Sequence, residues 1–302
     1  MSVPLIRSIL AGVEIGDSPG PDTVLATAAT LASALKADLH VVHAVESGPL
    51  APPLLPSVTL EMERAAEALD TVVGRTLPHG PVPASRHVGL GRAHRVLSDR
   101  AEALGVDLVV LGPHRGGHAL GGLGTTTDRI LRTLKVPCWV ARGDLNLPLR
   151  RVTVAIDFST RSHPALDLSL SLTSALGGSA GVPGAPPPRL DVLYVEWPAS
   201  LRDDPEMEEK MLLPRIADEV QSAENRTGLK GAALVQPRVL GAVDPSRGIL
   251  GHVAAESPGV VVLGTHGRGA VARTLLGSVA SIVAREAPVS VLLAPAPDTS
   301  GT

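Results

Sequence analysis

The sequence has few aromatic residues and a single cysteine among 302 residues. Because aromatic side chains make up only 1% of it, any core must be built from Val, Leu, Ile and Ala, which suits parallel strands buried on both faces. The single cysteine, Cys138, excludes an internal disulfide and any metal site that needs several thiolates. Since Cys138 falls in a predicted buried strand, we expect an inert thiol and not a nucleophile.

The sequence also lacks an excess of positive charge and any long apolar run. Lys and Arg number 27 against 30 Asp and Glu, and neither half is basic, which argues against a nucleic-acid partner. No apolar stretch is long enough to cross a bilayer, and the N-terminal segment lacks the basic and apolar regions of a signal peptide. We therefore expect a soluble cytoplasmic protein that binds neither nucleic acid nor membrane.

Two copies of one unit follow each other along the chain. Leu10–Glu14 (LAGVE) corresponds to Thr153–Asp157 (TVAID), and the later apolar runs of the two copies match at a nearly constant offset. In each copy short apolar runs alternate with longer helical patterns, which indicates parallel strands joined by right-handed crossovers. We predict an α/β fold of two tandem doubly wound (Rossmann-like) domains, 1–145 and 150–297, each with about five parallel strands and flanking helices.

Apolar periodicity and capping residues give the expected ends of the elements. A helix is predicted at His163–Leu176, with a proline in its first turn and a glycine after its last residue. Another helix is expected to begin at Asp244–Pro245, and Asp22–Leu35 and Arg92–Leu104 are the equivalent helices of the first copy. The strands of the second copy are predicted at Val152–Ile156, Leu190–Val195, Ala232–Leu240, Val260–Leu263 and Ser290–Leu293.

Segments rich in proline and glycine mark the expected connections. Ser47–Ser57 (SGPLAPPLLPS) and Gly177–Pro188 (GGSAGVPGAPPP) are predicted to be exposed loops. The second loop contains a GxSxG string, but it follows a helix and not a strand, so we do not interpret it as a nucleophile elbow. The linker between the copies, Gly143–Leu149, is too short for independent tumbling, so the halves are expected to pack on each other.

Glycines after the fourth strand of the second copy form a pattern suited to a phosphate. Gly264 and Gly267 follow that strand, and Gly277 precedes Ser278 at the predicted start of a helix. These turns lie at the carboxyl edge of the predicted sheet, where open α/β sheets bind ligands. Glycine lets the backbone approach a phosphate, and a helix N-terminus offers N–H donors and a positive dipole end. Ser278 can cap the helix and also donate to a phosphate oxygen, and Arg268 can add positive charge.

On these residues the sequence resembles the universal stress protein family, and both copies resemble it over nearly their whole length. The family's nucleotide motif, Gly-x2-Gly-x9-Gly-Ser/Thr, is met in the second copy. The resemblance implies that this copy binds an adenine nucleotide, ATP with or without Mg²⁺, with Asp157 near the ribose and Val195 against adenine. The nucleotide contacts that it implies are Ala155, Asp157, Val195, Leu263, Gly264, Gly267, Arg268, Gly277, Ser278 and Val279.

The first copy departs from this motif. Gly112 is present, but the loop after it reads GPHRGGHALGGLGTTT. Aligned from the helix, Thr126–Thr127 replaces the Gly-Ser pair; aligned from the glycines, Gly124–Thr125 is the pair, but the spacing is short. Glu14 replaces the aspartate that ends the first strand of the second copy. We therefore expect a degenerate nucleotide loop that binds nucleotide weakly or not at all.

Several candidate residues also have an ordinary structural interpretation. Asp157 can cap the turn after its strand without touching a ligand. His40 and His43 lie three apart on a predicted strand, so their side chains point to opposite faces, and a packed or hydrogen-bonded role is expected for each in place of a shared metal. His114 and His266 occupy matching loop positions, where contact with a phosphate and a plain loop histidine both remain open.

The resemblance implies a stress-response protein in which ATP in the second domain changes the surface shown to an unidentified protein partner. It also implies an internal pseudo-dimer, paired through Pro137–Ala141 and Pro288–Leu293, and a homodimer of two chains is possible. Two alternatives stay open: an interaction scaffold with a vestigial nucleotide site, and a slow ATPase or nucleotidyl transferase supported by fold analogy alone. Nothing in the sequence positions an attacking water, so we expect no enzyme beyond weak ATPase or autophosphorylation activity.

Overall fold

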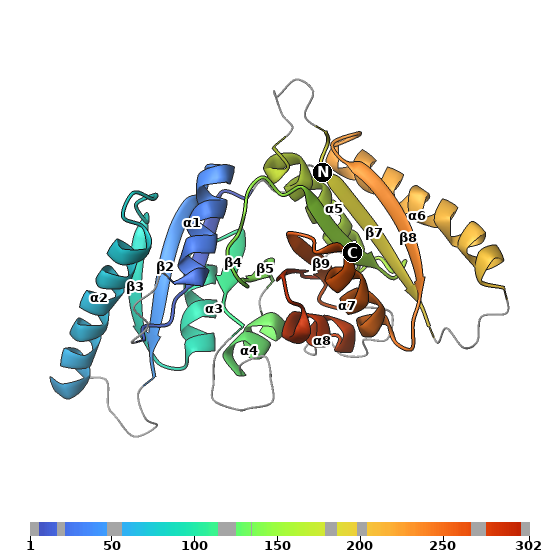
Figure 1. Ribbon diagram of the computed structural model, residues 1–302. Helices are drawn as coiled ribbons and strands as arrows, with labels where there is room; N and C mark the ends of the chain where they lie inside the picture. The colour runs from blue at the N-terminus through green and yellow to red at the C-terminus, as the bar shows by residue number, and fades with distance from the viewer. Residues whose placement is uncertain are drawn as a thin grey trace, which may run out of the picture. The chain divides into compact units, whose positions relative to one another are not determined.

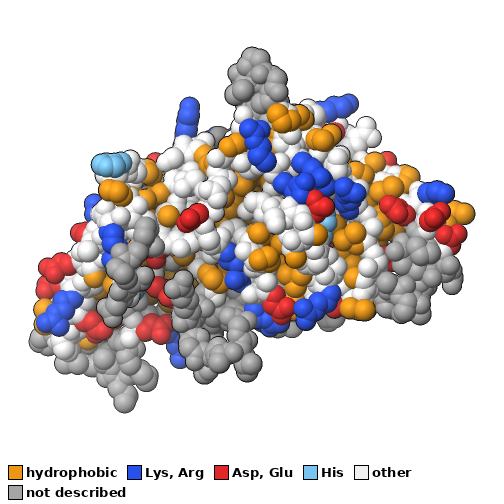
Figure 2. Space-filling view, viewed as in Figure 1, with side chains coloured by type: hydrophobic (Ala, Val, Ile, Leu, Met, Phe, Trp, Pro, Cys, Tyr) orange, Lys and Arg blue, Asp and Glu red, His pale blue; other side chains and the backbone are white. Residues whose placement is uncertain are grey.

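The computed structural model describes residues 6–16, 22–46, 56–113, 125–133, 135–178, 186–197, 204–266 and 276–296. These residues form two compact units, and the boundary between them lies near residue 145 of the sequence. Each unit is a parallel sheet covered by helices (Figure 1). On the face shown in Figure 2, Lys and Arg side chains are interspersed with Asp and Glu side chains.

The first unit contains five strands and four helices among its described residues. They are β1 (Ser8–Gly12), α1 (Thr23–Leu35), β2 (Asp38–Val45), α2 (Pro56–Thr76), β3 (Ser85–Leu90), α3 (Ala93–Leu104), β4 (Leu108–Leu111), α4 (Thr125–Thr133) and β5 (Cys138–Val140). The strands are parallel and lie in the order β3-β2-β1-β4-β5.

The second unit repeats this arrangement. Its elements are β6 (Arg151–Ile156), α5 (His163–Leu176), β7 (Arg189–Glu196), α6 (Pro205–Thr227), β8 (Leu234–Gly241), α7 (Pro245–Glu256), β9 (Val260–Gly264), α8 (Ser278–Glu286) and β10 (Ser290–Ala294). The order β8-β7-β6-β9-β10 is again all parallel. The predicted fold of two tandem doubly wound α/β domains is therefore confirmed.

In each sheet the strand order reverses direction beside the first strand of the unit. In the second unit β6 has β7 on one side and β9 on the other, so the chain reverses its winding direction beside β6. Helices α5 and α6 pack together, as do α7 and α8, and the two pairs cover opposite faces of the sheet. A ligand is expected where the loops after β6 and β9 separate.

Aliphatic side chains make the core, as the composition predicts. Strand β4 (LVVL) is buried along its whole length, and so is all of β9 (VVVLG) except its last residue. Cys138 is buried in β5, where burial raises the pKa of its thiol to about 12. At neutral pH that thiol is therefore protonated, which supports an inert role. None of the described helices combines the length and the apolar character needed to cross a membrane.

Capping residues explain the predicted helix ends. Helix α5 spans His163–Leu176 as predicted. Asp22 and Arg92, which we predicted as the first helical residues of α1 and α3, are instead their N-caps, and Asp22 Oδ1 accepts a hydrogen bond of 2.8 Å from Leu25 N. Asp244 caps α7 in the same way, since its Oδ1 accepts from the amide of Arg247 at 3.0 Å.

Two expectations about connections need correction. Pro56 and Ser57 were predicted to close a loop but form the first turn of α2, where proline is well tolerated because the first amides of a helix have no intrahelical acceptor. Strand β8 begins at Leu234 and not at Ala232. The rest of the loop predicted at Ser47–Ser57, and residues 179–185 of the other predicted loop, lie outside the described residues.

Candidate functional site

Strand register brings three of the predicted nucleotide contacts to one face of the second unit. Ala155 of β6 pairs with Leu193 of β7, so Val195, two residues further along β7, lies on the same face. The register of β6 with β9 places Leu263 on that face as well. All three lie near the carboxyl ends of their strands, on the side of the sheet that α7 covers.

Val195 is more enclosed than an open ligand contact would be. Only 7% of its surface is exposed, and a Cβ built on Gly248 of α7 would lie 2.6 Å from its Cγ1. Val195 therefore helps to pack α7 against the sheet. Ala155 is half-buried and leaves more of its surface open at the same edge.

Asp157 follows β6 directly and organises the turn into α5. Its Oδ1 accepts hydrogen bonds from Ser159 N at 3.0 Å and from Ser159 Oγ at 2.6 Å. The carbonyl oxygen of Ser159 in turn accepts from Ser162 N at 3.0 Å and from Ser162 Oγ at 2.8 Å. The capping interpretation of Asp157 is thus confirmed, while the side chain still lies half-buried at the carboxyl edge.

Gly264 lies where β9 meets this turn. A Cβ at this position would lie 3.0 Å from the carbonyl oxygen of Arg161 and 3.3 Å from that of His266. A side chain would therefore be in tight contact with these two backbone oxygens, which favours glycine here for packing before any phosphate is considered. Gly264 thus joins the turn after β6 to the loop after β9.

The start of α8 is tied to the end of β9. The amide of Gly277 donates to Thr265 O at 2.8 Å, and the amide of Thr265 donates to Ala294 O of β10 at 2.8 Å. Gly277 is the N-cap, with no side chain to accept from the helix, and the expectation that Ser278 caps α8 is wrong because Ser278 is its first helical residue. Gly277 therefore supplies no side-chain acceptor to the first-turn amides at the carboxyl edge of the sheet.

The exposed side chain of Ser278 and the half-buried Val279 begin this helix. His266 Nδ1 lies 2.9 Å from Thr265 Oγ1, which gives His266 a hydrogen-bonded role in the loop. Gly267 and Arg268 of the predicted motif, and His114 of the first copy, lie outside the described residues.

The first unit uses the corresponding positions differently. Thr127, which aligns with Ser278, is buried, and its hydroxyl donates to Gly112 O at 3.0 Å. Gly12, which aligns with Ala155, is closely packed: a Cβ there would lie 2.3 Å from Leu97 and 2.8 Å from Leu111. In the first unit, protein side chains therefore fill the space beside Gly12, and the hydroxyl of Thr127 is bonded within the protein. In the second unit the corresponding residues, Ala155 and Ser278, are half-buried and exposed.

The two predicted strand histidines in the first unit are hydrogen-bonded. His40 Nδ1 lies 2.8 Å from Ser85 Oγ, and His43 Nδ1 lies 2.9 Å from Val13 O. Burial lowers the pKa of His40, the largest of the effects upon it. These contacts support the structural role that the sequence favours over a shared metal.

A buried ion cluster at the amino end of β6 and β7 was not predicted. Asp191 is fully buried, accepts from Arg189 Nε at 2.6 Å and lies 3.5 Å from His252 Nε2 of α7. Burial by itself raises the pKa of Asp191, but His252 and Arg189 outweigh burial and hold that pKa below its ordinary value. Arg151 and Glu256 form an ion pair beside this group. The cluster fastens α7 to the sheet at the end opposite the candidate site.

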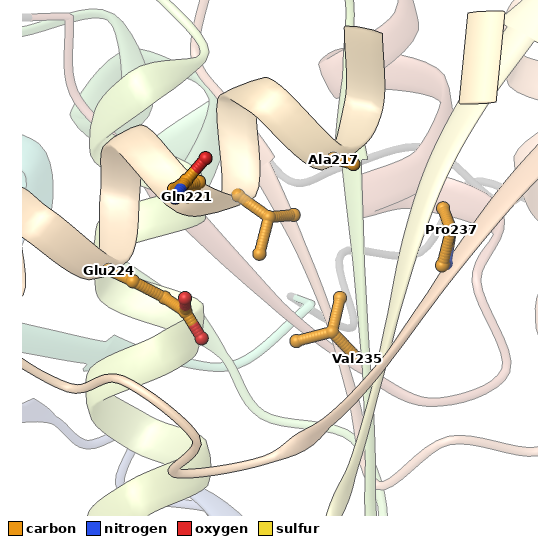
Figure 3. A pocket seen from close by; sticks show the side chains of 6 residues that line it. Ala217, Gln221, Glu224, Val235 and Pro237 are labelled. Carbon is orange, nitrogen blue, oxygen red and sulfur yellow. The ribbon is translucent and has the colours of Figure 1, made fainter. Parts of the chain in front are cut away.

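A separate hollow of about 260 Å³ lies between α6 and β8 (Figure 3). Its lining residues are Ala217, Val220, Gln221, Glu224, Val235 and Pro237. Glu224, the charged residue among them, accepts a hydrogen bond from Gly231 N at 3.2 Å. The hollow contains none of the predicted nucleotide contacts, and a lining with a carboxylate and no cation does not suit a phosphate.

Comparison with known proteins extends over both units. The model of the universal stress protein family matches residues 6–142 and 148–295. The fold is similar to that of a universal stress protein from Archaeoglobus fulgidus DSM 4304, at 20% identity, with 97% of each chain covered and a TM-score of 0.69. A structure assigned to the universal stress proteins from Pseudomonas aeruginosa UCBPP-PA14 is 18% identical, with 96% of this chain and 94% of that chain covered and a TM-score of 0.61.

A universal stress protein in complex with cAMP matches 50% of this chain and 99% of its own, at 21% identity and a TM-score of 0.36. A search of curated proteins gave no match. With two matches of the family model that together span most of its length, the chain belongs to the universal stress protein family.

Proposed function

We propose that the second unit, residues 150–297, binds ATP at its carboxyl edge. The observation that carries this proposal is the convergence of Asp157, Gly264 and Gly277 at one edge, linked by the packing of Arg161 O on Gly264 and by the hydrogen bond from Gly277 N to Thr265 O. Gly264 and Gly277 belong to the glycine motif of the sequence, and Asp157 matches the family's aspartate at the end of the first strand. Their closeness supports a single ligand site.

The parts of this site suit the parts of an adenine nucleotide. Ala155, which is half-buried, offers apolar surface that suits the base, and the buried Val195 and Leu263 lie beside it on the same face. The carboxylate of Asp157 suits a ribose hydroxyl, and the uncapped start of α8 at Gly277 suits phosphate oxygens, because helix amides and the helix dipole favour anions. Gly267, Arg268, Ser278 and Val279 complete the proposed contact set. Mg²⁺ would accompany the polyphosphate through the phosphate oxygens.

We further propose a regulatory role and no ordinary enzyme activity. Backbone amides and a helix terminus hold phosphates without supplying a base for water, so any hydrolysis or autophosphorylation is expected to be far slower than the rate of about ten per second that is typical of enzymes. Nucleotide occupancy would instead change the surface that a protein partner contacts.

The first unit, residues 1–145, has a second candidate function. The inward hydroxyl of Thr127 and the close packing of Leu97 and Leu111 on Gly12 favour a scaffold without nucleotide in this unit. In that role its loops would bind a protein partner while the second unit responds to ATP.

We also propose an internal pseudo-dimer, because two family units occur in one chain. In each unit the last strand, β5 or β10, closes one side of the five-strand order and is apolar. An unpaired apolar edge strand favours association, so pairing of β5 with β10 would protect both. A homodimer of two chains is compatible with this arrangement.

Acid extraction of the purified protein tests nucleotide binding directly. About one ATP or ADP per chain is expected from the wild type, and none from the double variant Asp157→Ala with Gly277→Val, measured by chromatography of the extract. If the double variant keeps the nucleotide at the wild-type level, the ligand does not occupy the proposed site. If neither protein releases nucleotide and ATP with Mg²⁺ also fails to bind on titration, the scaffold function is favoured for both units.

A further inference from the structure

The only phenylalanine and the only tyrosine of the chain pack against each other beside the candidate site. Phe158 follows Asp157 directly, and Tyr194 lies near the end of β7. Their ring centroids are 4.6 Å apart, with planes inclined at 36°. Such tilted aromatic pairs stabilise a structure beyond the area that they bury. In a chain with so few aromatic residues, this contact ties the turn after β6 to the neighbouring strand.

The backbone of Phe158 adopts an unfavourable conformation. Three described residues other than glycine have a left-handed φ, and two of them, Lys36 and Ser257, end helices α1 and α7. Phe158, with φ of 59°, lies in the turn between β6 and α5 instead. A left-handed backbone is strained for a residue with a side chain, so the surrounding contacts must hold this conformation in place.

Arg215 of α6 supplies a further contact that holds the ring. Its Cζ lies 4.2 Å from the centroid of Phe158, a cation–π distance. Tyr194 pairs with Ile156, so its side chain lies on the face of the sheet opposite Ala155 and Val195. The ring of Phe158 is therefore held from the α6 side, behind the face that carries the proposed adenine contacts.

The turn that follows Phe158 contacts two parts of the proposed nucleotide site. At its start, Asp157 Oδ1 accepts from both the amide and the hydroxyl of Ser159. Near its end, Arg161 O lies 3.0 Å from the place of a Cβ on Gly264. Fixing this turn therefore fixes the carboxylate of Asp157 relative to the first glycine of the phosphate motif.

We propose that Phe158, Tyr194 and Arg215 position Asp157 for a hydrogen bond from a ribose hydroxyl, and so give the site a preference for ribonucleotides over deoxyribonucleotides. This inference rests on the proposed function. A hydrogen bond to a carboxylate depends steeply on distance and angle. A site built to bond a substrate hydroxyl also discriminates strongly against the analogue that lacks it. Phe158 and Arg215 act through Asp157 and are positioning residues.

Titration calorimetry of the full chain with ATP, 2′-deoxy-ATP and 3′-deoxy-ATP tests this inference. The wild type is expected to bind ATP at least ~10-fold more tightly than one of the deoxy analogues. Phe158→Ala and Arg215→Met are expected to reduce this preference to roughly threefold or less, because they weaken the binding of ATP more than the binding of the analogue. Arg215→Lys keeps a cation over the ring and is expected to keep most of the preference.

Two further variants separate positioning from folding. Phe158→Gly removes the ring but accepts the left-handed backbone without strain, so it should fold and still lose the preference. Met211→Ala changes an exposed residue one turn before Arg215 and should behave as the wild type. If Phe158→Ala and Phe158→Gly weaken the binding of ATP and of the analogues equally, this inference is overturned while the proposed function stands. An unchanged preference for ATP in these variants would have the same consequence. A wild type that binds no nucleotide would overturn the proposed function and this inference together.

Discussion

Replacing Gly277 with valine is expected to weaken ATP binding by at least ~100-fold while leaving the second unit folded. The backbone of Gly277, at φ of −57° and ψ of 144°, is one that valine adopts readily, so the substitution introduces no backbone strain. Its side chain would stand at the start of α8, between the helix amides and the phosphates that they are proposed to bind. Titration calorimetry with ATP and Mg²⁺ measures the loss.

The matched control for this variant is Thr126→Val in the first unit. Thr126 aligns with Gly277 and precedes Thr127, whose hydroxyl is bonded to Gly112 O. If the nucleotide occupies the second unit, Thr126→Val leaves both affinity and stoichiometry unchanged. Wild-type affinity in Gly277→Val would show that the start of α8 does not bind phosphate, whatever happens in the first unit.

Replacing Asp191 with alanine is expected to destabilise the second unit by about 3 kcal/mol, a fall of roughly 10 °C in its Tm. Asp191 is fully buried in β7 between Arg189 and His252, and its loss leaves the guanidinium of Arg189 without its carboxylate. Denaturant unfolding followed by circular dichroism measures the change. Asp70→Ala is the matched control, because its ion pair with Arg86 in the first unit is exposed and such pairs contribute at most about 1 kcal/mol.

The same carboxylate makes the stability of the second unit depend on pH. Because the folded state holds the pKa of Asp191 below its ordinary value, the ionised side chain stabilises the fold above the unfolded pKa of about 4. This contribution is lost as the pH falls through the lower, folded pKa. The difference in unfolding free energy between wild type and Asp191→Asn is therefore expected to shrink as the pH falls below about 4. A difference that grows as the pH falls would contradict this.

The sequence predicted those parts of the fold that depend on local patterns. The apolar runs of β6, β9 and β10 and the end signals of α5 fix their elements within a residue or so, because caps and strand periodicity are local properties. The long helix α6 went unpredicted. It contains Pro214, which normally ends a helix, but Pro214 is exposed, so water can bond the carbonyl group that loses its partner.

The candidate site was only partly predictable for the same reason. The spacing of Gly264, Gly267 and Gly277 is visible in the sequence, because the motif is short and its residues are close together. The roles of Asp191 and Phe158 depend on partners far along the chain, His252 for one and Arg215 for the other. A carboxylate within the apolar run of β7 was the one local signal of a buried cluster, since buried aspartates need paired charges.

Titration of the nucleotide-free full chain with ATP and Mg²⁺, read for stoichiometry, most directly tests whether this protein has a single working nucleotide site. We predict one ATP per chain, lost in Gly277→Val and kept in Thr126→Val. Two ATP per chain, or one that survives in Gly277→Val, would contradict a single site at the carboxyl edge of the second unit.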